Sequence, residues 1–186
     1  MRVRREFALL LVVLALPVHW VHSAERTASL YQMHEKLLDQ EGRAIDLDVY
    51  RGQKVLVTMF YGSCPATCPL IIDTLRAIER KVQPAQLAQL RVLLVSLDSE
   101  RDTPAALHGL AQSRRIDTTR WTLAHADAAA VRRIAAALNI QYKKLPDGQF
   151  SHATIISALD AGGRIVVQSA ELGRADPELL RAISAP

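Results

Sequence analysis

Two nearly continuous apolar runs dominate the hydrophobic pattern, at residues 55–60 and 91–97. Runs of this kind, rich in β-branched residues, are typical of strands that are buried on both faces. Between them, apolar residues recur every three or four positions, as on one face of an amphipathic helix that ends near residue 81: Leu70, Ile71, Leu75, Ile78 and Val82. A strand, a helix and a strand in this order predict a right-handed βαβ crossover between parallel strands.

The rest of the chain continues to alternate between helix and strand signals. Before the first long strand we expect an amphipathic lead-in at 24–40 and a half-buried strand at 44–49. Pro84 is expected to end the first helix. The later expected elements are a helix at 104–115 capped by Asp102 or Thr103, a helix at 128–138 capped by Asp127, a strand or hairpin arm at 139–142, a turn at 145–148, strands at 152–159 and 164–168, and a helix at 178–183.

This order predicts an α/β domain with a central mixed sheet flanked by helices. A βαβ half followed by a β-hairpin and a closing helix is the arrangement of the thioredoxin-like fold, here with a helical insertion near 127–138.

The first residues have the pattern of a secretory signal. Three arginines precede an apolar stretch at 7–16, Pro17 breaks it, and small residues follow at 21–24. We therefore expect a signal peptide at 1–23, with retention as an uncleaved membrane anchor as the alternative, and a single domain at 24–186. The expected location is the periplasm or the outer face of the inner membrane.

Length and charge further limit the classes of protein to which this chain can belong. A chain of 186 residues, 49% hydrophobic, suits one well-buried domain. Its net charge of +4 falls to about +2 without the leader, and the arginines are scattered rather than clustered. A basic groove for nucleic acid is therefore not expected.

The candidate chemistry lies where the first long strand meets the helix. Cys64 and Cys68 are four residues apart at this turn, about one helical turn from each other. A helix start favours thiolates, which can bind one soft metal ion or form a disulfide. A purely structural disulfide is the alternative, but a loop this small would stabilise little.

A histidine would complete a trigonal site of two sulfurs and one nitrogen for Cu(I). Beyond the leader, which holds His19 and His22, the candidates are His34, His108, His125 and His152. His152 is favoured because it opens a strand expected to neighbour the strand before the cysteines; the alternative is an ordinary surface or core histidine. His108 and His125 are expected on or near helices, in solvent. Asp98 and Asp102 follow the second long strand and are expected either to orient the cysteine loop or to act as a helix cap and a solvated carboxylate.

Three segments together resemble the Sco/SenC family: FYGSCPATCP at 60–69, VSLDSERDTP at 95–104, and Ser151-His152 before a strand. The resemblance covers roughly residues 45–170. It implies a thioredoxin-like copper protein that assists assembly of the dinuclear copper site of cytochrome c oxidase. It also implies that Cys64, Cys68 and His152 bind Cu(I) or Cu(II), and that the cysteine pair has a thiol-disulfide role.

The expected partners are the copper-bearing oxidase subunit and other periplasmic copper carriers or thiol reductants, with membrane association through the N-terminus. A thiol-disulfide oxidoreductase without metal is the main alternative, although such enzymes favour two residues between the cysteines and a cis-proline where His152 stands. A peroxiredoxin-type peroxidase is disfavoured, because Gly62 and Ser63 precede Cys64 where that class has Pro and Thr.

Overall fold

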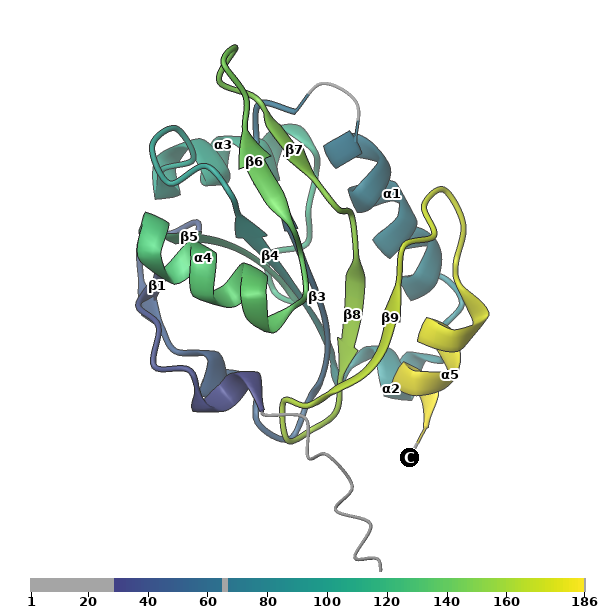
Figure 1. The fold of residues 1–186 in the computed structure, drawn as a ribbon. Coiled ribbons are helices and arrows are strands. Elements are labelled where there is room, and N and C mark those ends of the chain that lie inside the picture. Colours follow the sequence, from purple (N-terminus) through teal and green to yellow (C-terminus); the bar gives the residue numbers. More distant parts are fainter. Residues whose placement is uncertain (1–28, 65–66, 186) are drawn as a thin grey trace, which may run out of the picture.

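The computed structural model describes residues 29–64 and 67–185, with backbone alone for Thr67 and Cys68. The predicted signal peptide at 1–23 lies outside the described residues. Within them, seven strands form a mixed sheet in the order β2-β1-β5-β4-β3-β8-β9, and β6 and β7 form a separate ribbon (Figure 1). The strands are β1 (Leu37–Leu38), β2 (Ala44–Ile45), β3 (Lys54–Phe60), β4 (Leu90–Ser96), β5 (Trp121–Ala126), β6 (Tyr142–Lys144), β7 (Phe150–His152), β8 (Ile156–Leu159) and β9 (Ile165–Ser169).

Helices cover both sides of this sheet, with α4 on one side and α1 and α5 on the other (Figure 1). The described helices are the 3₁₀ segments η1 (Leu30–Gln32) and η2 (Leu47–Tyr50), and the α-helices α1 (Thr67–Glu79), α2 (Pro84–Leu87), α3 (Pro104–Ser113), α4 (Ala128–Ala137) and α5 (Pro177–Ser184). None of them is long and apolar enough to cross a membrane.

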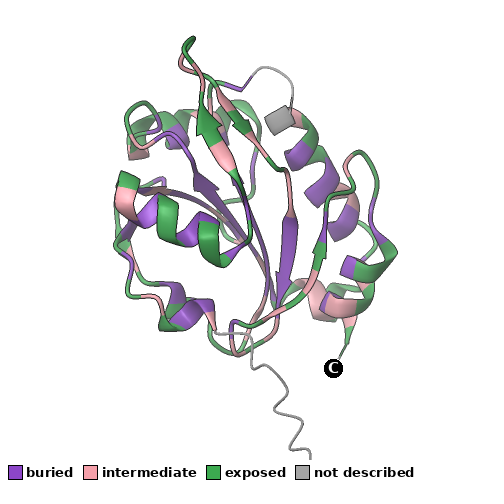
Figure 2. Cartoon of the chain, in the orientation of Figure 1, coloured by how far each residue is buried: buried purple, intermediate pink, exposed green. Residues whose placement is uncertain are grey.

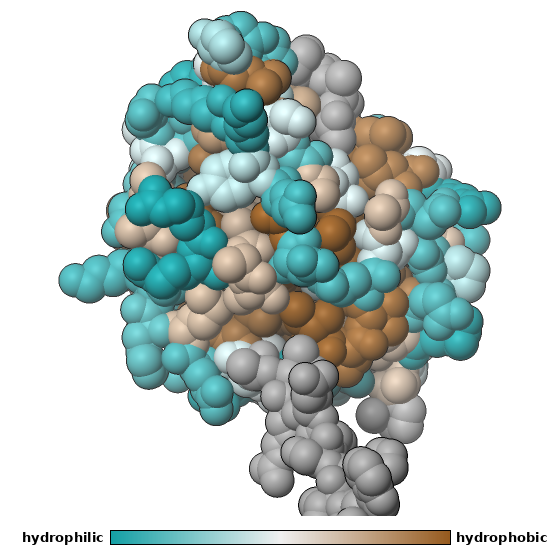
Figure 3. All heavy atoms as spheres, viewed as in Figure 1, coloured by the Kyte–Doolittle hydropathy of each residue, from teal (hydrophilic) through white to brown (hydrophobic). Residues whose placement is uncertain are grey.

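The two apolar runs form the centre of the sheet, as predicted. β3 and β4 pair in parallel from Lys54–Leu90 to Phe60–Ser96, and the connection between them contains α1 and the short helix α2. β8 pairs antiparallel with β3 on the other side. Figure 2 shows these strands buried while the outward faces of the helices remain exposed. Hydrophobic side chains also reach the surface over β8 and β9 (Figure 3), where Val166 is 50% exposed.

The helix caps largely follow the sequence signals. Asp127 accepts hydrogen bonds from two backbone N–H groups at the start of α4, the predicted helical insertion. At α3, Thr103 rather than Asp102 is the cap, and Pro104 occupies the first turn. Pro84 does not end the first helix: α1 stops at Glu79 and Pro84 begins α2, because proline lacks the N–H that a first helical position leaves unused.

Two short elements differ from the prediction. The expected strand at 44–49 is a strand only at Ala44–Ile45, and the 3₁₀ turn η2 follows. In η2, backbone hydrogen bonds join residues three apart. This turn buries the side chains of Leu47 and Tyr50 and leaves Val49 60% exposed. The alternating pattern therefore does not form a strand here. The lead-in at 24–40 contains, within its described part, η1 and the short strand β1, which pairs with β2 and β5.

The predicted strand at 152–159 is also two elements. His152 ends β7, which pairs with β6 in the ribbon, whereas the strand beside β3 begins only at Ile156. Ala153 donates its N–H to Gln141 and thereby continues the ribbon, while Ile155 uses its carbonyl to accept from the Thr58 hydroxyl of β3. The chain therefore changes sheets between these residues.

Candidate metal centre

Cys64 sits at the end of a tight turn. β3 ends at Phe60, and the Cys64 N–H donates to the carbonyl of Tyr61 at 3.2 Å, which closes a four-residue turn. The Cys64 side chain is buried. The helix α1 starts three residues later, so Cys68 lies in its first turn, as predicted. The Cys68 side chain is outside the described part of the structure.

His152 lies beside this turn. Its ring stands edge-on to the Tyr61 ring, with the ring centroids 6.0 Å apart, and Phe150 of the same strand packs on Tyr61 at 5.4 Å. The aromatic contacts thus bring the end of β7 against the residue that opens the cysteine turn. β7 and the cysteine turn are far apart in sequence, and the contacts of Tyr61 with His152 and Phe150 bring them together.

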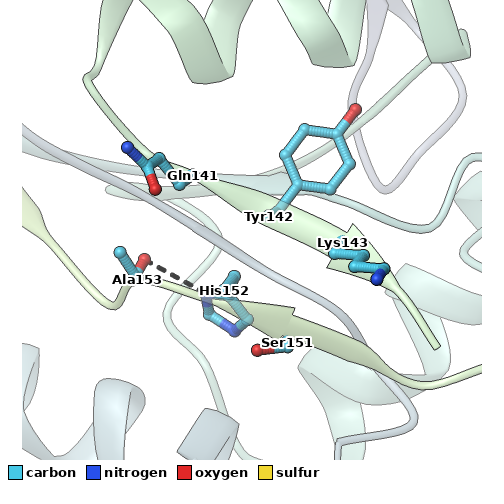
Figure 4. A pocket seen from close by; sticks show the side chains of 6 residues that line it. All are labelled: Gln141, Tyr142, Lys143, Ser151, His152 and Ala153. Carbon is cyan, nitrogen blue, oxygen red and sulfur yellow. Dashed lines mark hydrogen bonds between the residues drawn. The ribbon is translucent and has the colours of Figure 1, made fainter.

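The imidazole of His152 is oriented for a ligand role. Its Nδ1 is 3.2 Å from the carbonyl oxygen of Ala153 (Figure 4), so this nitrogen donates and Nε2 keeps its lone pair. Metal-binding histidines commonly donate their other N–H to a carbonyl in this way. Partial burial lowers the pKa of His152 from 6.5, against a smaller opposite effect of the Ala153 carbonyl, which favours the neutral form that a metal requires.

Asp102 holds the cysteine turn in place through hydrogen bonds. Its buried carboxylate accepts the Gly62 N–H at 2.7 Å and the Ser96 hydroxyl at the end of β4. Burial raises the pKa of Asp102, and these two hydrogen bonds partly oppose the rise. Gly62 is required here because a Cβ would lie 2.7 Å from Asp102 Oδ1. Of the two roles considered for Asp102, orienting the cysteine loop is therefore the one that the geometry supports.

Asp98 has a different place. It is buried and ion-paired with Arg101, and it accepts the N–H groups of Glu100 and Arg101. Asp98 therefore shapes its own loop and is not the solvated carboxylate of the alternative prediction.

The other histidines lie elsewhere. His34 and His108 are exposed, and His108 is near Glu41 and Gln112. His125 is half-buried in β5 rather than solvated near a helix, and its Nδ1 is 3.0 Å from the Asp102 carbonyl oxygen. Of the four candidates, His152 is the one with a ring contact to the cysteine turn.

The described side chains hold no group of three His, Cys, Asp or Glu residues that could bind a metal ion. The predicted set includes Cys68, whose side chain lies outside them, so the three-ligand site stays a prediction. An open pocket on the ribbon includes His152 but not Cys64; its lining is Gln141, Tyr142, Lys143, Ser151, His152 and Ala153 (Figure 4).

Sequence reasoning missed the contribution of Tyr61 and Arg101. Tyr61 directly follows the apolar run at 55–60 and belongs to the cysteine segment, but no contact was assigned to its ring. Arg101 lies in the loop where Asp98 and Asp102 were weighed, and its charge between two acidic residues was the signal available.

Comparison with known proteins identifies relatives over most of the chain. The family model SCO1/SenC matches residues 23–184. The "Protein SCO2 homolog, mitochondrial" of Bos taurus is 34% identical over 85 residues, which are 45% of this chain and 32% of that protein. The matched segment thus spans about a third of the length of that relative.

Solved structures share the fold. The structure of Bradyrhizobium japonicum ScoI with copper bound is 26% identical, with a TM-score of 0.64 over 80% of this chain and 94% of that chain. BsSco is described as a member of the Sco family of cytochrome c oxidase assembly proteins with a disulfide switch; it is 18% identical, with a TM-score of 0.67 over 84% and 91% of the two chains.

These likenesses confirm the predicted α/β, thioredoxin-like fold. With the family model matching residues 23–184, this chain belongs to the SCO1/SenC family.

Proposed function

We propose that this protein is a copper metallochaperone that binds Cu(I) or Cu(II) through Cys64, Cys68 and His152. The observation that carries the proposal is the position of His152, whose ring packs beside the cysteine turn with Nδ1 turned to a carbonyl. Two thiolates and one neutral imidazole are ligands that suit copper, and the Bradyrhizobium relative is a ScoI with copper bound.

The cargo would be delivered to the dinuclear copper site of cytochrome c oxidase. BsSco is described as belonging to a family of cytochrome c oxidase assembly proteins, which supports this acceptor. The copper-bearing oxidase subunit and periplasmic copper carriers or thiol reductants are the proposed partners. The leader pattern at 1–23 supports export to the periplasm or to the outer face of the inner membrane.

A competition titration of the reduced protein with Cu(I) and a coloured chelator tests the proposal. We expect one copper per chain, and a loss of affinity above about 100-fold in His152→Ala, because even outer-shell partners of metal ligands are worth 10–100-fold. His108→Ala is the matched control, since His108 is an exposed histidine away from the site. Failure of the parent protein to retain copper, or equal affinities in all three proteins, would contradict the proposal.

Thiol-disulfide exchange by the same cysteines is a second candidate, favoured by the disulfide switch described for BsSco. The two functions are compatible, because both sulfurs must be reduced to bind Cu(I). The reduction potential of the Cys64–Cys68 pair tests this candidate: a value below about −300 mV, which is typical of structural disulfides, would argue against the pair acting as an oxidant of other thiols.

A further inference from the structure

The ribbon that carries His152 stands apart from the main sheet. β6 and β7 pair with each other in a two-stranded sheet of their own, and the tip projects from the body of the molecule (Figure 1). Isolated two-stranded ribbons are marginally stable in water, so contacts with the body must fix the ribbon. At its base the Tyr61 ring contacts do so.

At the tip, Arg101 connects the ribbon to the body. Its guanidinium donates to the carbonyl oxygen of Gly148, in the turn between β6 and β7, and its Nε pairs with the carboxylate of Asp98. Asp98 is 1% exposed, so this end of the link is buried and fixed. A planar guanidinium bonded on two sides holds both partners in a defined geometry.

The same loop holds the cysteine turn. The Asp98 N–H donates to the Ser96 hydroxyl oxygen at 2.9 Å, and Ser96 donates to Asp102, which accepts the Gly62 N–H. A continuous hydrogen-bonded path therefore runs from Gly62, two residues before Cys64, to Gly148 on the ribbon. The path gives the loop at 98–102 contact with both parts of the candidate site.

A second ion pair also connects the tip of the ribbon to the loop at 98–102, but it contributes less than the contacts of Arg101. Lys144 pairs with Glu100 at 2.6 Å, but the two side chains are 44% and 76% exposed. Exposed pairs of this kind contribute little to stability because solvent screens them. Arg101, with one partner buried, is therefore the more effective link of the two.

We propose that Arg101 is a positioning residue of the metal site: it links the loop that holds the cysteine turn to the ribbon that carries His152. It thereby sets where the imidazole lies relative to the thiolates. The inference rests on the proposed copper function for its consequence, but the mechanical link is a property of the metal-free protein.

Amide hydrogen exchange of the metal-free protein tests the link itself. In Arg101→Ala we expect exchange within residues 142–152 to rise about tenfold, because the ribbon loses its main tie at the tip. Arg43→Ala is the matched control: Arg43 also pairs with a buried carboxylate, that of Asp39, outside the site. Unchanged exchange of the ribbon in Arg101→Ala would overturn the proposal.

A double-mutant cycle with Cu(I) tests the consequence. We expect Arg101→Ala to weaken copper binding about tenfold, as for an outer-shell residue, and Arg101→Lys to restore part of the loss. In the His152→Ala background, Arg101→Ala should cause no further loss, because its effect passes through His152. Additive losses, or none in the single variant, would overturn the positioning role. A parent protein that holds no copper would instead refute the proposed function, while hydrogen exchange still decides the link.

Discussion

At the scale of single residues, Gly62 is required by space. A Cβ at this position would lie 2.7 Å from Asp102 Oδ1, and Asp102 cannot easily yield because it is buried and bonded to Ser96. We expect Gly62→Ala to lower the free energy of unfolding by about 1–3 kcal/mol, as overpacked sites do. Urea denaturation followed by circular dichroism measures this change.

Two comparisons sharpen that experiment. In an Asp102→Ala background the carboxylate is gone, so Gly62→Ala should cost clearly less than in the parent protein. Gly109→Ala on α3, where a Cβ meets nothing within 4 Å, should instead stabilise by about 0.5–1 kcal/mol through helix propensity. Equal costs of Gly62→Ala in both backgrounds would show that the Asp102 contact is not the reason.

The residues of the candidate site differ in whether their roles could be predicted from the sequence. Cys64 and Cys68 are close in the chain, so their turn could be placed from the apolar patterns on either side. His152 is favoured because its strand is expected beside β3, and that expectation is wrong: His152 ends β7, which pairs with β6, and the strand beside β3 begins at Ile156. Tyr61 and Arg101 could not be assigned, because their roles depend on contacts with Phe150, His152 and Gly148, which only the folded chain brings near.

At the scale of elements, continuous apolar runs and helix caps proved reliable signals, whereas short alternating segments did not. β3 and β4 are buried along almost their whole length, so packing and pattern agree. The segment at 44–49 alternates in sequence, but only Ala44–Ile45 is a strand; η2 follows, and in it Leu47 and Tyr50, three residues apart, are both buried in the core. The split at 152–159 depends on Thr58 and Gln141, which are distant in sequence.

The cap of α5 provides the test at this scale. Asp176 accepts the Glu178 N–H at 2.7 Å and the Ser169 hydroxyl, and it is buried. We expect Asp176→Ala to lower the free energy of unfolding by about 1–2 kcal/mol, measured by urea denaturation. The control Gln83→Ala, at a helix start without a side-chain cap bond, should leave stability nearly unchanged. Similar values for the two variants would contradict a capping role of Asp176.

At the scale of the whole molecule, several carboxylates are better stabilised as anions in the folded state than in the unfolded chain. The pKa of Glu35 is lowered from 4.5, chiefly by its hydrogen bond to Arg133. The pKa values of other carboxyls are lowered from 3.8, namely those of Asp117, Asp127, Asp160 and Asp176. Near pH 4 the native state therefore binds fewer protons than the unfolded state, and stability must rise with pH in this range.

We therefore predict that the folded protein becomes less stable as the pH falls. The stabilisation from these groups is complete above their ordinary values of 4.5 and 3.8 and is lost as pH falls through their lower native values. Asp102 opposes the trend, because burial raises its pKa and its protonation on acidification favours the native state. We expect the Tm, measured by circular dichroism, to fall steadily from about pH 5 to pH 3.

Two variants separate these contributions. Glu35→Gln should lower the Tm at pH 7 and flatten the acid decline, because the pair with Arg133 no longer depends on a proton. Asp102→Asn should steepen the decline, because the one carboxyl identified as opposing it no longer titrates. A Tm that stays level between pH 5 and pH 3 in the parent protein, or a steeper decline in Glu35→Gln, would contradict the assignment. The two variants change the slope in opposite directions, so a general loss of stability cannot account for both results.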